Sequence, residues 1–413
     1  MRRVNGVAIA ASVALGAVAG FAFAAHAQSA VTAFEGARLI VGDERAPIEN
    51  ATLVVDGARI VQAGRAADIR VPAGATRVNL AGKTVMPMLI DTHVHLSPTR
   101  ERLTRDLKQR AYYGVSAALS MGTDNIELLP MRGETIPGAA RFLSAARGIT
   151  MPEPGRITVP HWINNEAEGR KAVQDIAAQK ADIVKIWVDT RDGKYKKLTP
   201  EIYGAIIDEA HKSGLRVAAH IFDLEDGKGL IRAGIDVLAH GVRDKDIDDE
   251  LVAMFKQRPN LVLIPNLPDR GVKTDLSWLQ AGLPAADFER LEKANTDRPA
   301  AQHFFGIQAL NLAKLNAAGV RIVLGTDGNR PWGPHEEMFD MVTAGMTPMQ
   351  VIVAATRNSA ALLRLADAGT LEAGKSADFI VLDANPLDDI TNTRRISAVY
   401  LRGAAVDRAQ PVR

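Results

Sequence analysis

The sequence contains no cysteine. Disulfide bonds and thiolate metal ligands are therefore both excluded. A metal site in this chain would have to use imidazole and carboxylate groups. A chain without cysteine suits an oxidising compartment, although it does not require one.

The chain also lacks a large excess of charge of either sign. Its 50 basic residues outnumber its 48 acidic residues by two. Arg2 and Arg3, in an acid-free segment of residues 1–27, account for that difference, so the remaining chain holds 48 of each. This balance gives no electrostatic reason to expect nucleic acid or an anionic membrane as a partner. Low-complexity segments and long-period repeats are absent as well.

One long apolar run is present, and it lies at the start of the chain. Arg2 and Arg3 precede the run from Val7 to Ala25, and Ala25-His26-Ala27 follows the small-x-small pattern of a cleavage site. These features predict a signal peptide over residues 1–27, removed to leave Gln28 first, and an exported protein of the periplasm or the medium without stable membrane insertion. The alternative is an uncleaved membrane anchor, because the run is long enough to span a bilayer. The two arginines leave the export route open between the general and the twin-arginine pathway.

The length and the order of apolar runs predict an α/β protein built around one large barrel. Strand and helix patterns alternate over residues 85–367, as expected for a (β/α)8 TIM barrel. β-rich stretches flank this region at residues 28–84, where Asp56-Gly57 indicates a hairpin, and at residues 368–413. Each stretch is too short to bury a core alone, so we expect the two to form one small β-sandwich. Thr347, Pro348 and Gln350 predict the start of the last barrel helix. The expected barrel strands are Val85–His95, Val115–Ser120, Arg141–Ala146, Ile183–Val188, Leu215–His220, Ile235–His240, Leu261–Ile264 and Arg321–Asp327.

Histidines stand at the ends of three of these strands. His93 and His95 share a face of the first strand, because strand side chains alternate with period two. His220 and His240 end two apolar runs that have the same plan, each beginning with glycine. Barrel enzymes place their chemistry at such strand ends, and neutral imidazole is a good metal ligand. The alternative is that these histidines satisfy hydrogen bonds in loops or in the core.

Two further residues extend this set. Asp327 ends the last strand, where it could cap the next helix or bind metal and move protons as an acid–base group. Lys185 alternates with apolar neighbours and is expected to point into the barrel, where a buried ammonium is costly. It could form a salt bridge with a barrel carboxylate. Its neutral amine could instead react with carbon dioxide, and the resulting carbamate could bridge two cations.

These residues give the chain a clear resemblance to the amidohydrolase superfamily, in the branch of imidazolonepropionase-like and Xaa-Pro-dipeptidase-like secreted hydrolases. The resemblance covers nearly all of the mature chain. The motifs that carry it are Ile90-Asp-Thr-His-Val-His, Lys185, His220, His240-Gly241, Gly325-Thr-Asp327, Ala354-Ala-Thr-Arg-Asn358 and Gly374-Lys-Ser-Ala-Asp378. It implies that His93, His95 and Asp327 hold one divalent metal, that His220 and His240 hold a second, and that carboxylated Lys185 bridges them. Zinc is the expected metal. Imidazolonepropionases lack the bridging lysine, so Lys185 argues against that activity.

The resemblance further implies hydrolysis of a small-molecule amide, such as a dipeptide or an N-acyl amino acid. A metal-bridging hydroxide would attack the carbonyl, and Asp327 would carry the proton to the leaving amine. The alternatives are hydrolysis of a carbamate, urea, lactone or phosphotriester at the same site, or metal binding without catalysis. Assembly into a homo-oligomer is compatible with the sequence. The expected substrate-contacting residues, which lie on loops past the strands, are His161, Phe222, Arg330, Trp332 and His335.

Overall fold

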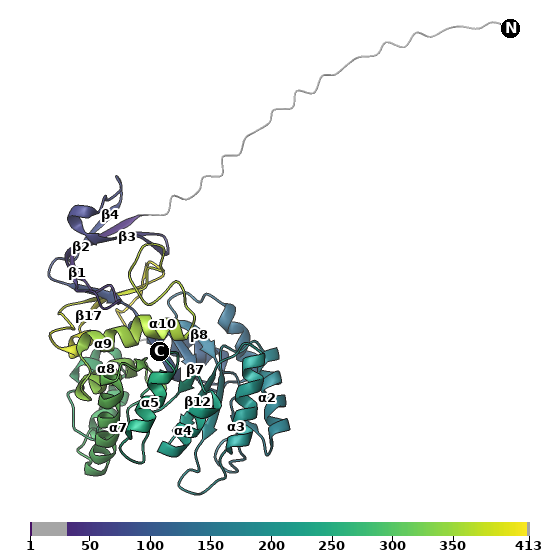
Figure 1. Ribbon diagram of the computed structural model, residues 1–413. Coiled ribbons are helices and arrows are strands. Elements are labelled where there is room, and N and C mark those ends of the chain that lie inside the picture. The colour runs from purple at the N-terminus through teal and green to yellow at the C-terminus, as the bar shows by residue number, and fades with distance from the viewer. Residues whose placement is uncertain (2–30, 411–413) are drawn as a thin grey trace.

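A computed structural model describes residue 1 and residues 31–410 of the protein (Figure 1). The predicted signal peptide therefore lies outside the described residues, apart from Met1. No helix in the described part of the chain combines the length and the hydropathy that crossing a membrane requires.

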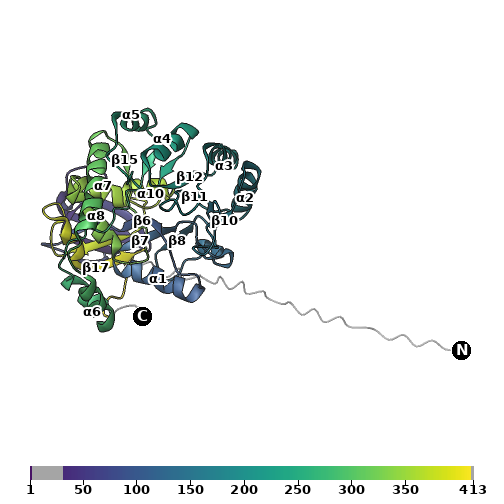
Figure 2. The ribbon, with the colours of Figure 1, turned by 90° about the horizontal axis from the view of Figure 1, so that it is seen from below.

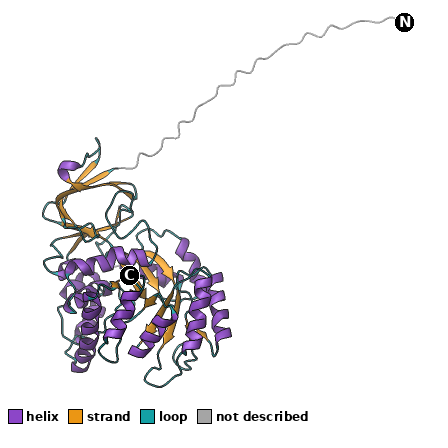
Figure 3. Ribbon diagram, in the orientation of Figure 1, coloured by secondary structure: helices purple, strands orange, loops and turns teal. Residues whose placement is uncertain are grey.

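The two ends of the described chain share one sheet, which lies above the helices in Figures 1 and 3. The strand order is β18-β17-β16-β5-β1-β2-β3, and β4 also pairs with β1. Strand β16 runs antiparallel to β5, so the C-terminal segment joins the N-terminal one as expected. The predicted hairpin at Asp56-Gly57 is confirmed between β2 and β3. The strands are β1 (Thr32–Leu39), β2 (Ile48–Asp56), β3 (Arg59–Arg65), β4 (Thr76–Asn79), β5 (Thr84–Pro87), β16 (Phe379–Leu382), β17 (Ile396–Leu401) and β18 (Ala404–Ala405).

The central region consists of parallel strands that alternate with helices, which confirms the predicted α/β class. One sheet has the order β6-β7-β8 and the other the order β10-β9-β11-β12-β13-β14-β15. Figure 2 shows the helices arranged around these strands. The strands are β6 (Leu89–Val94), β7 (Val115–Ser120), β8 (Arg141–Ser144), β9 (Ile149–Thr150), β10 (His161–Trp162), β11 (Val184–Val188), β12 (Val217–Ile221), β13 (Val237–Leu238), β14 (Val262–Leu263) and β15 (Arg321–Ile322).

The helices of residues 166–178, 200–212, 224–233 and 249–257 are amphipathic, and their buried apolar residues join the main core. The predicted capping box at Thr347 and Gln350 is present at the start of α9. The α-helices are α1 (Arg100–Tyr112), α2 (Glu166–Ala178), α3 (Pro200–Lys212), α4 (Leu224–Ala233), α5 (Asp249–Gln257), α6 (Ala285–Ala294), α7 (Pro299–Ala317), α8 (Gly333–Thr343), α9 (Pro348–Val353) and α10 (Ser359–Leu362). Shorter helical turns cover η1 (Ala66–Asp68), η2 (Ile126–Gly133), η3 (Ser277–Gly282), η4 (Ala354–Asn358) and η5 (Ile390–Arg394).

Hydrogen bonds join the two central sheets on both sides. On one side, the amide of Asp182 donates to Ser144 at 2.9 Å, which ties the segment before β11 to β8. On the other side, the amide of Thr92 in β6 donates to Leu324 at 3.0 Å, and Val94 forms a parallel bridge with Gly328. The segment that follows β15, the last central strand, therefore lies beside β6, the first central strand.

The prediction of a single strand over Val85–His95 is wrong. Residues Thr84–Pro87 belong to the outer sheet, whereas Leu89–Val94 pair with β7 in the central region. Pro87 has no amide hydrogen to donate to a ladder. The amide of Met88 donates to the carbonyl of Asp378 at 3.1 Å. One apolar run thus supplies strands to two sheets, a division that hydrophobicity alone does not mark.

Candidate metal centre

All six residues predicted as metal ligands come together at one end of the central strands. His93 lies on β6, Lys185 on β11 and His220 on β12. His95, His240 and Asp327 lie one, two and five residues past the ends of β6, β13 and β15. Parallel strands bring their carboxyl ends to the same edge of a sheet, so residues distant in sequence meet there. His93, Lys185 and His240 are fully buried.

Three of the six converge most closely. The ligand atoms of His93, His95 and Asp327 all lie within 4.8 Å of one another. Nε2 of His93 and Nε2 of His95 are each 3.1 Å from Oδ1 of Asp327. This arrangement of two imidazoles and one carboxylate suits a divalent metal ion.

The remaining three residues continue the cluster. Nζ of Lys185 is 3.3 Å from Nε2 of His93, and Nε2 of His240 is 3.5 Å from Oδ2 of Asp327. The rings of His220 and His240 lie with their centroids 4.4 Å apart. Lys185 therefore lies beside His93, and its charge also acts on His220.

Burial sets the protonation of these residues. It lowers the pKa of His93 to about 3, with the charge of Lys185 adding to the effect, and it lowers the pKa of His220 to about 3. Burial, with Arg243 nearby, holds the pKa of His240 well below its usual value. These imidazoles are neutral at neutral pH, which is the form that binds metal.

The carboxylate and the amine are also in reactive forms. Burial tends to raise the pKa of Asp327, but His93 and His240 outweigh it and hold that pKa well below the ordinary value. Burial lowers the pKa of Lys185 to about 7. A neutral amine is therefore accessible near neutral pH, as carbamate formation requires.

Residues that the sequence analysis missed hold the ligands in place. Nδ2 of Asn266 lies 2.7 Å from Nδ1 of His93 and donates to the carbonyl of Ala239 at 3.0 Å. Oγ1 of Thr123 lies 3.1 Å from Nδ1 of His95. Such outer partners orient ligand rings. Asn266 lies shortly after the end of β14, just as the candidate ligands lie at or after strand ends. Its position in the sequence could therefore have identified it as a residue of the site.

Asp91 on β6, which the sequence analysis also missed, connects this strand to the loop that carries Asp327. Its buried carboxylate accepts hydrogen bonds from the amides of His93 and Thr326, both at 3.2 Å, and from the hydroxyl of Thr326 at 2.8 Å. The Arg110 guanidinium lies 3.5 Å away. Asp327 itself has a left-handed backbone, with φ of 53°, and this buried network fixes its direction.

Gly325 should tolerate no larger residue, because three neighbours occupy the space of a side chain. A Cβ there would lie 2.4 Å from Ile264, 2.7 Å from Asn266 and 2.8 Å from His93. We expect Gly325→Ala to lower the free energy of unfolding by about 1–3 kcal/mol, the usual cost of overpacking, and to reduce activity by displacing His93. Urea unfolding and rate measurements check this.

Gly204→Ala is the matched control for that variant. A Cβ at Gly204, inside α3, meets nothing within 4 Å, so alanine should raise stability by roughly 0.5–1 kcal/mol. Equal stability changes in the two variants would contradict the packing argument.

The donor set fits divalent metal ions. Nε2 of His240 is buried and has no hydrogen-bond partner among the described residues, although it faces Asp327. The ligand atoms of His93, His95 and Asp327 converge, all within 4.8 Å of one another. The alternative from the sequence was that the histidines form hydrogen bonds in loops or in the core. In that case their ligand atoms would not be expected to converge.

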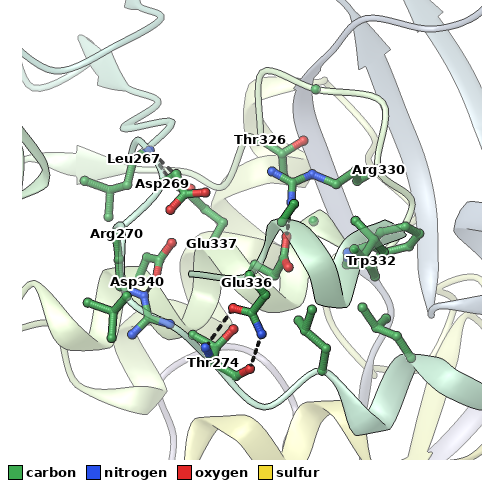
Figure 4. Close-up of a pocket in the computed structure, with 18 of the residues that line it drawn as sticks. Leu267, Asp269, Arg270, Thr274, Thr326, Arg330, Trp332, Glu336, Glu337 and Asp340 are labelled. Atoms are coloured by element: carbon green, nitrogen blue, oxygen red, sulfur yellow. Dashed lines mark hydrogen bonds and ion pairs between the residues drawn. The ribbon is translucent and has the colours of Figure 1, made fainter. Parts of the chain in front are cut away.

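Two cavities adjoin the cluster. A cavity of about 260 Å³ includes Asp327, Arg330 and Trp332 in its lining, and Figure 4 shows Arg330 and Trp332 around it. Arg330 is exposed and pairs with Glu336 at 3.4 Å. A second cavity of about 580 Å³ is lined by Phe222 together with residues that contact His220 and His240. Arg330, Trp332 and Phe222 therefore stand where a substrate could reach them.

The other two expected substrate contacts lie elsewhere. The ring of His335 is buried, and its nitrogens lie 2.8 Å from the carbonyl of Tyr113 and 3.1 Å from the hydroxyl of Thr393. The structure contradicts a substrate contact for His335, because the helix α8 turns its side chain into the core. His161 is half-buried on β10 with Arg147, Asp175 and Lys171 as its charged neighbours, so its predicted role has no support from the geometry.

Comparisons with known proteins identify what the chain is similar to. The model of the amidohydrolase family matches residues 84–406. Ochratoxinase from Aspergillus niger is 26% identical over 428 residues, covering 88% of this chain and 83% of that protein. Imidazolonepropionase from Shouchella clausii is 25% identical over 378 residues, covering 82% and 80%. The solved structure of a candidate prolidase from Bifidobacterium longum has a TM-score of 0.76 at 28% identity, covering 93% and 96%.

Proposed function

Because the chain belongs to the amidohydrolase family and is therefore a hydrolase acting on carbon–nitrogen bonds, we propose that it cleaves the amide bonds of dipeptides or N-acyl amino acids at a centre of two divalent metals. Membership of an enzyme family favours catalysis over metal binding alone. The observation that carries the proposal is the convergence of His93, His95 and Asp327 beside the buried amine of Lys185.

We propose that eight strands of the two central sheets, β6 to β8 and β11 to β15, form the barrel predicted from the sequence. The hydrogen bonds on both sides of the sheets support it, as does the likeness to the prolidase structure. The ligands then lie at the carboxyl end of the barrel, where enzymes of this architecture carry out their chemistry. The outer sheet would be the small sandwich formed by residues 28–84 and 368–413.

We assign His93, His95 and Asp327 to one metal and His220 and His240 to the other, with carboxylated Lys185 between them. Zinc fits a set of imidazoles and carboxylates without thiolates. The bound pair would lower the pKa of a water molecule and polarise the amide carbonyl. The short distance from Lys185 to His93, 3.3 Å, supports its bridging position.

The residues of the chain have separate tasks in this reaction. Asp327 is held between His93 and His95 by its Oδ1 atom and lines the 260 Å³ cavity. From there it accepts the proton of the attacking water and donates it to the nitrogen of the leaving amine, as a general base and then a general acid. Asn266 and Asp91 keep His93 and the Asp327 loop in the geometry that this transfer needs.

Protein purified without chelator should contain close to two divalent ions per chain, because five donors would divide into two groups, with Lys185 as the proposed bridge. Elemental analysis measures this ratio, and removal of the metals should abolish hydrolysis, which restored zinc should recover. A ratio near one with full activity would contradict the second metal. Turnover of a carbamate, urea, lactone or phosphotriester, with none of any amide, would show that the site serves one of the alternative substrates.

We also propose that the mature protein begins near Gln28 and is exported, on the basis of the arginine-led apolar segment and Ala25-His26-Ala27. N-terminal sequencing of protein from a secreting host should find Gln28 first. Recovery of a membrane-bound form that still carries Met1 would overturn this proposal.

A further inference from the structure

Arg243 is a half-buried cation that forms no ion pair with an aspartate or glutamate among the described residues. Its Nε atom is buried without a hydrogen-bond partner there. Its Nη2 contacts Nδ1 of His240, and its amide donates to the carbonyl of Phe222 at 2.9 Å. Charged groups shielded from water in proteins are normally paired, so Arg243 is poised to receive an anion.

The cavity next to Arg243 carries an excess of positive charge. Its volume is about 580 Å³, and its charged lining residues are Arg156, Arg191, Lys194, Arg243, Asp189 and Asp192. The four cations outnumber the two acids. A cavity with this lining favours an anionic group over a neutral one.

The same cavity reaches the metal ligands. Nε2 of His220 lies 2.9 Å from Oδ2 of Asp189 and 3.0 Å from Nη1 of Arg191. Arg191 already pairs with Asp189 at 2.7 Å, and Arg156 pairs with Glu153. Unlike the guanidinium groups of Arg191 and Arg156, that of Arg243 has no ion-pair partner among the described residues. It lies beside His240.

The backbone at two other lining residues of this cavity supports a binding role. Arg191 and Asp192 are consecutive non-glycine residues with left-handed backbones, φ of 53° and 58°. Such conformations are unfavourable for residues with a Cβ and gather where ligands bind. This turn places the Arg191 guanidinium against His220 rather than in solvent.

We propose that Arg243, with Arg191 beside it, binds a carboxylate of the substrate while the scissile amide lies over the metal ligands. The inference rests on the proposed amide hydrolysis and names the residue that binds the free carboxylate carried by dipeptides and N-acyl amino acids. A planar guanidinium matches a carboxylate with two parallel hydrogen bonds. The aromatic rings of Phe222 and Tyr195 in the same cavity offer an apolar surface to the adjoining side chain.

Arg330 is the arginine among the residues that the sequence predicts to contact the substrate. It is exposed in the other cavity and is paired with Glu336. An exposed, paired cation gives little selectivity, whereas a half-buried, unpaired one penalises every ligand that leaves it unpaired.

The test compares N-acetyl-L-phenylalanine, N-acetyl-L-leucine and N-acetyl-L-methionine with their C-terminal amides, using acetate release by the metal-loaded enzyme. Arg243→Met should lower kcat/KM for the acids about 10- to 100-fold and change it for the amides by less than about threefold. The rival variant is Arg330→Met, and the matched surface control is Arg102→Met on α1. Metal content is measured for each protein.

Binding supplies a readout that does not need turnover. In an Asp327→Asn background, calorimetry should show the acids binding about tenfold more tightly than the amides, and Arg243→Met should remove that preference. If no amide of the panel is hydrolysed but this preference is found, the proposed amide hydrolysis fails and the carboxylate site stands.

Three results would overturn the carboxylate site. The first is equal binding of acids and amides, or no binding of any acid, by the Asp327→Asn protein. The second is loss of the preference in Arg330→Met with its retention in Arg243→Met. The third is an equal loss of activity toward acids and amides in Arg243→Met together with loss of metal, which would make Arg243 a positioning residue for His240.

Discussion

Asp327→Asn is expected to remove nearly all hydrolysis while leaving the fold intact. Asparagine has the shape of aspartate, and it adopts the left-handed backbone of this position, φ of 53°, more readily than most residues. It cannot accept a proton at neutral pH, and general acid–base groups contribute about 10²- to 10⁴-fold to rates. Loss of a charged metal ligand would add to that effect.

Steady-state rates, metal content and thermal unfolding of the purified variant check this result. Asp249→Asn, on α5, serves as a control, because Asp249 is exposed and lies outside both cavities and the cluster. If Asp327→Asn kept more than about a tenth of the wild-type rate at unchanged metal content, its effect would fall below the range of a general acid–base group, and the assigned role would be wrong.

Lys185→Ala is expected to lose both activity and metal. The Lys185 side chain is fully buried on β11, with its Nζ 3.3 Å from His93. An ammonium there would repel two cations, whereas a carbamate reverses the charge and supplies two oxygen atoms. Its pKa, lowered by burial to about 7, makes the reacting amine available near neutral pH.

Chemical rescue distinguishes a bridging lysine from a structural one. A short carboxylic acid such as propionate should restore part of the metal content and rate to Lys185→Ala, because it returns the bridging oxygens. Lys185→Arg should stay inactive, since a guanidinium keeps its charge and forms no carbamate. The exposed Lys171→Ala, on α2, is the matched control. An active Lys185→Arg enzyme, or a bare amine beside two bound metals in electron density, would refute the carbamate.

The outcome for the fold shows which local signals are reliable. The Asp56-Gly57 hairpin and the capping box of Thr347 and Gln350 are confirmed, because both depend on backbone preferences and contacts within a few residues. The prediction of one strand from Val85 to His95 was wrong. The division of this run between two sheets depends on hydrogen bonds to Asp378 and Gly114, which lie far from it in the sequence.

The same distinction applies to the site. The sequence by itself determined that these histidines, Lys185 and Asp327 would meet near strand ends, since the parallel order of strands brings those ends to one edge. That they bind metal stays a prediction. The tertiary structure alone decided which loop residues face the cluster. Arg243, Arg191 and Asp189 lie against the ligand histidines, whereas His335 is turned into the core. The direction of a loop side chain depends on packing between distant elements, and no local pattern in the sequence records it.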